Sequence, residues 1–144
     1  MFFKISKMVD ILKMSDDDLK YITGLGDAKE GLRKILNKIN SSLILVTLGK
    51  NGVLSYYKGQ FMHTPTFNKI RIKETTGCGD AFMAAVIYRL LKNDNFPVFS
   101  RSKLTDILTF ANGVATIVGT RYGASNSMPQ LQEAEEFISL YHKE

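Results

Sequence analysis

The sequence predicts an α/β fold in which helices cover a mostly parallel sheet. Residues 43–47 form a continuous apolar run that ends in a threonine, which is typical of a parallel strand covered on both faces. Residues 29–39 and 104–118 repeat apolar residues at helical spacing. A glycine-containing stretch, residues 74–82, stands between a strand-like segment and an apolar helix, as at the turn of a strand–helix unit.

Composition narrows the class of protein. The chain has 144 residues, enough for one domain with its own core, and a net charge of +5. Its basic residues are scattered among acidic ones, so we expect no nucleic-acid partner, and no apolar run has the length of a membrane span. The single cysteine, Cys78, excludes an internal disulfide and a cysteine-based metal site. With no signal-peptide pattern at the start, we expect a cytoplasmic protein.

The N-terminal segment is predicted to form a short strand over residues 8–12 and then a helix. Ser15 is a good N-cap for this helix, and Asp18 lies three residues later, as in a capping box. Gly24 ends the helix, and a second helix over residues 29–39 leads to the apolar strand. Capping alone accounts for Ser15 and Asp18, and it leaves open whether the pair also supports a metal ion.

A glycine turn, residues 47–52, follows the apolar strand and joins it to the next segment. Residues 53–57, 60–63 and 70–73 are predicted to be antiparallel strands. His63 is interpreted as structural or exposed, because a single histidine cannot form a metal site.

The stretch 74–82, Glu-Thr-Thr-Gly-Cys-Gly-Asp-Ala-Phe, carries the strongest chemical signal. At the start of a helix the first backbone N–H groups have no internal partner and carry partial positive charge, so they can bind phosphate. Asp80 lies in the same turn, where its carboxylate can accept a proton from a hydroxyl that attacks the phosphate. The combination indicates phosphoryl transfer to an alcohol. A glycine-rich turn in which Asp80 only caps the helix is the structural alternative.

Two apolar helices are predicted after this stretch, over residues 81–91 and 104–118. The second is apolar nearly all round and should be buried. Its polar Asn112 then needs a partner, which is either a neighbouring backbone group or a ligand. Pro129 is predicted to open the final helix.

Residues 74–82 resemble the C-terminal signature of the PfkB/ribokinase family of carbohydrate kinases, Asp-Thr-x-Gly-Ala-Gly-Asp-x-Phe. The resemblance implies a ribokinase-like three-layer α/β/α sandwich, with Asp80 as the catalytic base. Glu74 replaces the first Asp of the family pattern, and a cysteine replaces its Ala. By the same resemblance, the anion hole is formed by Gly77, Cys78 and Gly79.

Shorter motifs match the family in the same order. Ser15-x-x-Asp18 stands where the family has a polar pair that organises Mg²⁺ and the phosphates of ATP, which implies indirect support of Mg²⁺ by Asp18. Asn112 would lie near the adenine. The ribose and phosphates of ATP would be lined by Thr47, Gly49 and Gly52.

Residues 119–129 match the closing pattern of the family. In ribokinase-like members, carbonyl groups of this loop and the first acidic residue of the signature hold a monovalent cation, commonly K⁺, for which oxygen ligands are suitable. A loop that simply turns at Gly123 is the structural alternative. The resemblance assigns the cation to Glu74, Thr76, Val118, Arg121, Gly123 and Ser127.

Matching features run from residue 9 to residue 129, whereas family members are about twice as long as this chain. We therefore expect residues 1–144 to be the C-terminal, nucleotide-binding half of such a kinase, without the N-terminal sugar-binding half and its lid. The predicted function is ATP-dependent phosphorylation of a sugar hydroxyl, with fructose as the favoured sugar.

Two alternatives to a fructokinase-like enzyme stay open. The chain is either a truncated, non-catalytic nucleotide-binding module, or a kinase of the same family that acts on ribose, a ketodeoxy sugar acid or a nucleoside. A sheet that is cut at this point would expose apolar strand edges. We therefore expect a homo-oligomer or association with the missing half.

Overall fold

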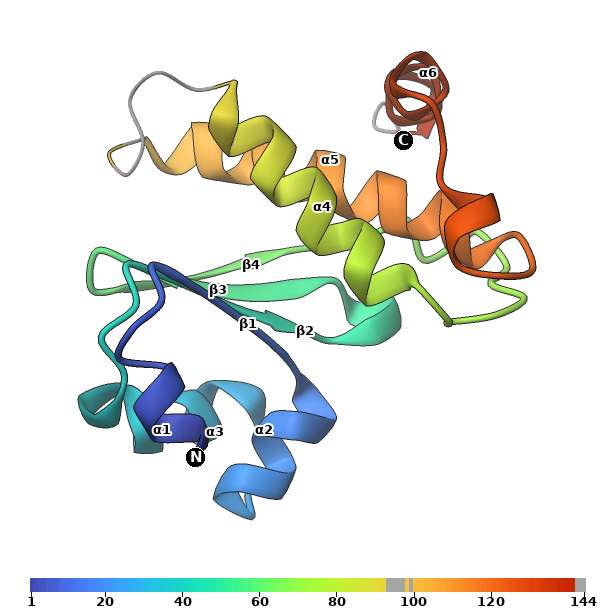
Figure 1. The fold of residues 1–144 in the computed structure, drawn as a ribbon. Coiled ribbons are helices and arrows are strands. Elements are labelled where there is room, and N and C mark those ends of the chain that lie inside the picture. The colour runs from blue at the N-terminus through green and yellow to red at the C-terminus, as the bar shows by residue number, and fades with distance from the viewer. Residues whose placement is uncertain (93–97, 99, 142–144) are drawn as a thin grey trace. The chain divides into compact units, whose positions relative to one another are not determined.

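The computed structural model describes residues 1–92, 98 and 100–141 and divides the chain into two compact units, Met1–Thr64 and Pro65–Glu144 (Figure 1). The first unit holds a four-stranded sheet in the order β1-β2-β3-β4. In the described part of the second unit, the secondary-structure elements are helices, joined by loops. Among the described residues, none of the helices combines the length and apolar character that spanning a bilayer requires.

The sheet of the first unit is mixed. β1 and β2 are parallel, and the other two pairings, β2 with β3 and β3 with β4, are antiparallel. The expected parallel pairing is present only between β1 and β2, and the prediction of antiparallel strands at residues 53–57 and 60–63 is confirmed. The physical reason is the length of the connections, because only the β1–β2 link is long enough to carry helices, whereas short turns join antiparallel neighbours. The strands are β1 Ile11–Ser15, β2 Leu43–Thr47, β3 Val53–Tyr57 and β4 Gln60–Thr64.

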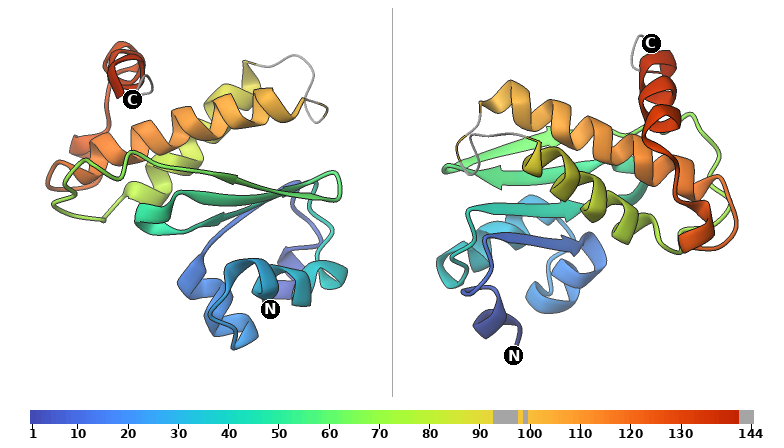
Figure 2. Two further views of the ribbon diagram at one scale, coloured as in Figure 1. Left: turned by 180° about the vertical axis from the view of Figure 1, so that it is seen from behind. Right: turned by 45° about the horizontal axis from the view of Figure 1, so that its top comes forward.

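Helices cover one face of this sheet. α2 and α3 lie on the same side of the strands in both views of Figure 2, and their apolar side chains meet those of β1, β2 and β3. The elements are α1 Phe2–Ile5, α2 Asp16–Thr23, α3 Ala28–Ile35 and the 3-10 turns η1 Leu36–Lys38 and η2 Gly49–Asn51. The buried cluster consists of Met14, Leu19, Leu32, Ile35, Ile44, Val46 and Leu54.

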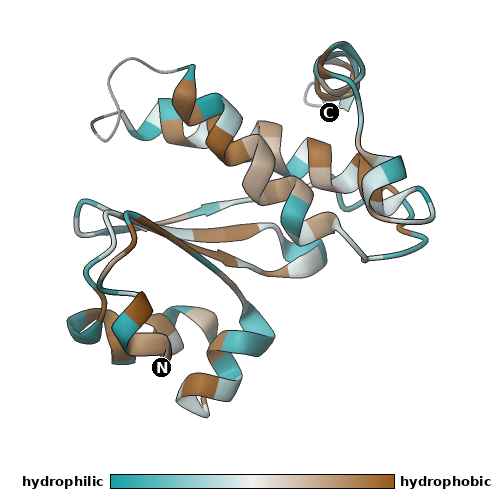
Figure 3. Cartoon of the chain, viewed as in Figure 1, coloured by the Kyte–Doolittle hydropathy of each residue, from teal (hydrophilic) through white to brown (hydrophobic). Residues whose placement is uncertain are grey.

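The predicted boundaries agree with the structure where burial decides them. Figure 3 shows β2 and α4 as largely hydrophobic and the acidic start of α2 as hydrophilic. The strand expected at residues 8–12 instead begins at Ile11 and runs directly into the capping residue Ser15. The strand expected at residues 70–73 does not form. The backbone N–H of Lys73 instead donates to the Gly119 carbonyl oxygen over 2.7 Å, so this segment is bonded to the C-terminal end of a helix.

The second unit is built on the long buried helix α5, Arg101–Gly119, against which α4, Cys78–Leu91, packs. The C-terminal helix α6, Leu131–Tyr141, also packs on α5. This second contact is close: a Cβ atom added at Gly113 of α5 would lie 2.6 Å from Cγ1 of Ile138. A 3-10 turn, η3 Ser125–Ser127, lies in the loop between α5 and α6.

The close approach of α5 and α6 gives a stability prediction for Gly113→Ala. Overpacking costs about 1–3 kcal/mol and the helix propensity of Ala returns up to about 1 kcal/mol, so we expect the free energy of unfolding to fall by about 1 kcal/mol. The measurement is denaturant unfolding followed by circular dichroism.

Two further variants make this test specific. In an Ile138→Ala background the clash is gone, so Gly113→Ala should become neutral or stabilising. Gly26→Ala is the matched control, because nothing lies within 4 Å of a Cβ at that position. Stabilisation by Gly113→Ala alone would contradict the observed packing of α6 on α5.

Candidate active site in the second unit

Helix α4 begins at Gly77, which is its N-cap and has a φ of 80°. A Cβ atom at this residue would lie 2.9 Å from Cβ of Ala124, in the loop that follows α5. A left-handed backbone and a close neighbour together restrict the position to glycine. The predicted signature turn and the predicted closing loop are therefore in direct contact.

The first turn of α4 leaves backbone N–H groups free. The amide of Cys78 donates to the carbonyl of Thr75 over 3.1 Å, and that of Ala81 donates to Gly77 over 2.9 Å. Within the described residues, the amides of Gly79 and Asp80 have no acceptor. The free donors and the positive end of the helix dipole make this turn suited to an anion.

Asp80 lies in this same first turn, and its side chain is exposed. Free amides and an accessible carboxylate are thus combined at one helix terminus. The predicted anion hole differs in one group, because the Cys78 amide is already used inside the turn. Among the described residues, the amides of Gly77, Gly79 and Asp80 itself have no backbone acceptor.

The side chain of Cys78 is half-buried. Burial, and to a smaller degree the Glu74 carboxylate, raises the pKa of its thiol. Its sulfur lies 3.8 Å from the carbonyl oxygen of Glu74. The side chain therefore stays neutral and fills space, as the alanine of the family pattern would.

Glu74 joins the signature turn to the closing loop. Its Oε2 atom accepts a hydrogen bond of 3.0 Å from the backbone N–H of Gly123. The Gly123 amide first, and then the Thr76 hydroxyl, hold the pKa of the Glu74 carboxyl below its usual range. The main chain adds a second link, since the amide of Glu74 donates to the carbonyl of Gly119 over 3.2 Å.

Of the residues predicted to hold a monovalent cation, Val118 lies in the last turn of α5 and the others lie in the two joined loops, but several are already bonded. The carbonyl of Val118 accepts from the Arg121 amide at 3.0 Å, and the carbonyl of Ser127 accepts from the Arg121 guanidinium at 3.2 Å. Arg121 also pairs with Glu133. The hydroxyl of Ser127 donates to the Tyr122 carbonyl over 2.9 Å. The predicted ligand atoms are oxygens, which is the kind of ligand that a hard monovalent cation prefers.

A site that holds a divalent metal ion through protein side chains alone would be expected to contain several carboxylates. Among the described residues, no group of three or more His, Cys, Asp or Glu side chains comes together in the manner of a metal site. The predicted Mg²⁺ support rests on Ser15 and Asp18 of the first unit, where both parts of the capping box form. The Asp18 amide donates to the Ser15 hydroxyl at 3.0 Å, and the Ser15 amide donates to Asp18 Oδ2 at 2.9 Å.

These cap contacts account for the electrostatics of Asp18. The Ser15 amide first, and the Ser15 hydroxyl second, lower the pKa of the Asp18 carboxyl. Capping is thus confirmed, and metal support stays a prediction. Of the residues predicted to bind nucleotide in the same unit, Thr47 donates its hydroxyl to the Met14 carbonyl at 3.4 Å, and Gly49 and Gly52 have φ values of 54° and 90°.

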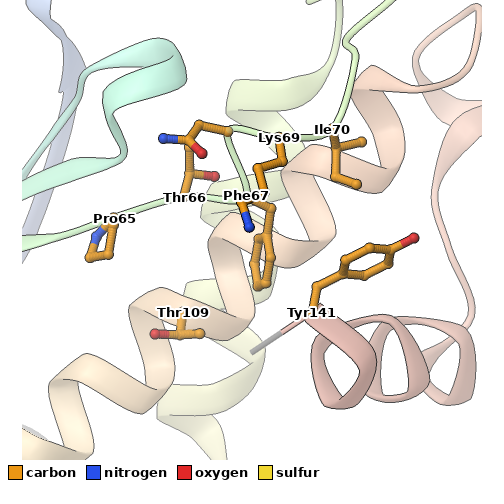
Figure 4. Close-up of a pocket in the computed structure, with 8 residues that line it drawn as sticks. Pro65, Thr66, Phe67, Lys69, Ile70, Thr109 and Tyr141 are labelled. Carbon is orange, nitrogen blue, oxygen red and sulfur yellow. The ribbon is translucent and has the colours of Figure 1, made fainter. Parts of the chain in front are cut away.

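Asn112 is buried in α5, and its side-chain amide donates to the carbonyl of Pro65 over 2.9 Å. The backbone partner that the sequence left open is therefore present. Beside it the second unit has a cavity of about 300 Å³ (Figure 4). The lining residues are Pro65, Thr66, Phe67, Asn68, Lys69, Ile70, Thr109 and Tyr141.

Sequence reasoning missed this cavity. Its walls come from a loop, the middle of α5 and the end of α6, so no local motif brings them together. Figure 4 shows the rings of Phe67 and Tyr141 from different elements around it. The single available signal was an aromatic side chain in the loop after β4, at Phe67.

Comparison with solved structures defines the fold class. The chain matches a fructokinase from Vibrio cholerae O395 in its fructose-, ADP- and calcium-bound form with a TM-score of 0.80 and 28% identity, over 90% of this chain and 41% of that one. It matches a ribokinase from Thermotoga maritima with a TM-score of 0.79 and 27% identity, over 95% and 44% of the two chains. The predicted ribokinase-like α/β fold is confirmed.

Sequence comparison then gives the family. Fructokinase-1 of Zea mays is 33% identical over 129 residues, which are 90% of this chain and 39% of the relative. Residues 3–131 match the model of the pfkB family carbohydrate kinases. The chain belongs to this family. It spans about two fifths of the length of the curated relatives that it matches, 39% of the Zea mays protein and 36% of Fructokinase-1 from Oryza sativa subsp. japonica.

The Glu74 contact gives a prediction of pH dependence. The folded pKa of Glu74 lies below the unfolded value, so its stabilising effect is present above the ordinary carboxyl pKa of about 4.3 and is lost as the pH falls through the lowered folded value. In Glu74→Gln the group no longer titrates. The melting temperature of the wild type should therefore exceed that of the variant at pH 6 and approach it near pH 3.

The control is Asp106→Asn, in the same unit, because Asp106 is exposed on α5. For this variant the difference in melting temperature from the wild type should change little over the same pH range. A Glu74→Gln difference that is equally flat would show that the bond to Gly123 does not stabilise the folded chain.

Proposed function

We propose that this chain is the C-terminal, nucleotide-binding part of an ATP-dependent sugar kinase of the fructokinase type. The observation that carries the proposal is the first turn of α4, where the free amides of Gly79 and Asp80 accompany an exposed carboxylate. The family membership and the fructokinases among the relatives support it. Fructose is the favoured sugar, since the matched Vibrio cholerae structure contains fructose and ADP.

In the proposed reaction Asp80 accepts the proton of the sugar hydroxyl. The hydroxyl oxygen forms a bond to the γ-phosphorus, the bond from this phosphorus to the β–γ bridging oxygen breaks, and ADP leaves. The N–H groups of the α4 turn stabilise the negative charge on the oxygens of the moving phosphoryl group. Both contributions come from one turn, which fixes the base relative to the donors.

Two ions are proposed from the family resemblance. Mg²⁺, supported indirectly by Ser15 and Asp18, would neutralise charge on the phosphates. A monovalent cation such as K⁺ would add positive charge beside the α4 turn, held by oxygen atoms from Glu74 and the loop of residues 118–127. Thr47, Gly49 and Gly52 are proposed to contribute to nucleotide binding in the same way.

The cavity of the second unit is proposed to receive the base of the nucleotide. Its volume of about 300 Å³ is at the lower end for ligand sites, and its walls combine the aromatic residues Phe67 and Tyr141 with polar residues such as Asn68 and Thr109. A flat heteroaromatic ring suits such walls, because it stacks on side-chain rings and bonds to polar side chains. Asn112 would then act indirectly, by holding the Pro65 wall.

A non-catalytic nucleotide-binding module is the second candidate. The observation that favours it is the capping box of α2, in which the side chains of Ser15 and Asp18 are bonded to each other's backbone, so that capping alone accounts for both. Other sugars remain alternatives, since a ribokinase is among the matched structures. We also propose that the chain self-associates or binds the missing part, because β1 has a neighbour on one side only in the described sheet.

The first test is Asp80→Asn, measured by titration calorimetry with Mg·ATP and by a coupled assay of ADP release with fructose. Loss of a positioned base should lower the rate of transfer by about a hundredfold or more while ATP still binds. Asp106→Asn is the control that should keep full rate.

The outcomes separate the two candidates. Binding of ATP by the wild type without any transfer to fructose favours the non-catalytic module. Phosphoryl transfer at an unchanged rate in Asp80→Asn would show that Asp80 is not the catalytic base. Transfer to ribose or a nucleoside in place of fructose would keep the reaction and change the sugar.

The second test concerns the cavity. Tyr141→Ala removes one aromatic wall, and because stacking on a base contributes about 1–3 kcal/mol, we expect ATP affinity to fall by at least about fivefold. Tyr141→Phe keeps the ring and should bind normally. Tyr21→Ala, at a residue that is 93% exposed, is the control. Equal affinity for ATP in Tyr141→Ala and the wild type would show that the base does not bind in this cavity.

A further inference from the structure

The turn of residues 48–52, which follows β2, makes a hydrogen bond to a histidine side chain of another strand. The ring atom Nε2 of His63 lies 2.6 Å from the carbonyl oxygen of Asn51. A carbonyl oxygen can only accept, so Nε2 carries the hydrogen and donates it. His63 thus connects strand β4 to the turn of residues 48–52.

Within the part of the chain that the structure describes, the other hydrogen bonds of the turn are internal to it. The amide of Leu48 donates to the carbonyl of Gly52 over 2.8 Å, and the amide of Asn51 donates back to Leu48 over 3.0 Å. The amide of Gly52 donates to Gly49 over 3.1 Å. These bonds close the loop on itself, whereas the His63 contact ties it to a different strand.

His63 is well placed to act as a fixed anchor. It lies in β4, where it is the cross-strand partner of Leu54, and the neighbouring pair Val53 and Thr64 is buried. β4 is an edge strand of the described sheet, so the backbone of this histidine is held on one side, by its pairing with β3. Its ring is exposed, so it is not needed to fill the core.

We propose that His63 is a positioning residue for nucleotide binding, which acts by holding the turn of residues 48–52 in the shape that receives ATP. This inference rests on the proposed function of the turn as part of the nucleotide site. Without the anchor the turn keeps its internal bonds but gains freedom, and binding ATP must then pay for ordering it. The expected result is weaker ATP binding with little change in stability.

The test compares three substitutions in the full 144-residue chain. His63→Ala removes the donor, and since one hydrogen bond contributes about 1 kcal/mol, the dissociation constant of Mg·ATP should rise about fivefold. The amide nitrogen of Gln reaches about as far as Nε2, so His63→Gln should restore the affinity. The amide nitrogen of Asn reaches only as far as Nδ1, so His63→Asn should behave like His63→Ala.

Two measurements separate positioning from a general structural role. Hydrogen exchange should be faster at the amides of Leu48, Asn51 and Gly52 in His63→Ala, and normal in His63→Gln. The melting temperature should fall by only a few degrees in His63→Ala and His63→Asn, as the loss of about 1 kcal/mol predicts, and stay close to the wild type in His63→Gln. Gln60→Ala, an exposed residue of the same strand, is the control for both measurements.

The outcomes distinguish this inference from the proposed function. If the wild type does not bind ATP, the proposed function fails, and the exchange rates alone decide whether His63 holds the turn. If the wild type binds ATP and His63→Ala binds it equally well, the nucleotide site stands and the positioning role is overturned. Weak binding that His63→Gln does not restore would also overturn it.

Discussion

The contact between the start of α4 and the loop after α5 is the constraint on which the candidate site depends. The Glu74 carboxylate accepts from the Gly123 amide, and the Gly119 carbonyl accepts from the amides of Lys73 and Glu74. The backbone of Gly77 meets Ala124 so closely that a side chain has no room. Two segments about 45 residues apart in the sequence are thereby fixed to each other.

This contact explains why α4 can begin with unpaired backbone N–H groups. A helix N-terminus is usually closed by a side chain, as Ser15 closes α2, but no side-chain hydrogen bond caps α4. The start of α4 is instead held from the side by the closing loop, which leaves the amides of Gly79 and Asp80 available. The arrangement costs stability at the helix terminus, and it provides the unpaired donors that an anion site requires.

Sequence reasoning predicted the parts of the fold that burial or local capping decides. The strand at Leu43–Thr47 and the capping box of Ser15 and Asp18 are as predicted, because apolar runs and cap spacing are local signals. The strand expected at residues 70–73 does not form, since its alternating pattern had no partner strand. Ile72 instead packs against Gly119. The cavity beside α5 was beyond prediction, because its walls come from three separate segments.

In the candidate site, too, local features could be predicted from the sequence, whereas contacts between remote segments could not. Asp80 and the glycines are candidates that the signature alone indicates, whereas the use of the Cys78 amide inside the turn depends on a backbone bond that no pattern encodes. The bond of His63 to Asn51 was equally invisible, because an exposed histidine on a strand carries no sign of its partner. Contacts between segments that are remote in sequence are what the structure adds.

The two departures from the family signature are accommodated at this same contact. Glu74, longer than the usual Asp by one methylene, directs its carboxylate to the Gly123 amide. Cys78 directs its sulfur toward the Glu74 carbonyl and the backbone of Gly119. Both side chains therefore lie on the side of the turn that faces the closing loop. Asp80 is exposed, so the substitutions change how the turn is held and leave its carboxylate accessible.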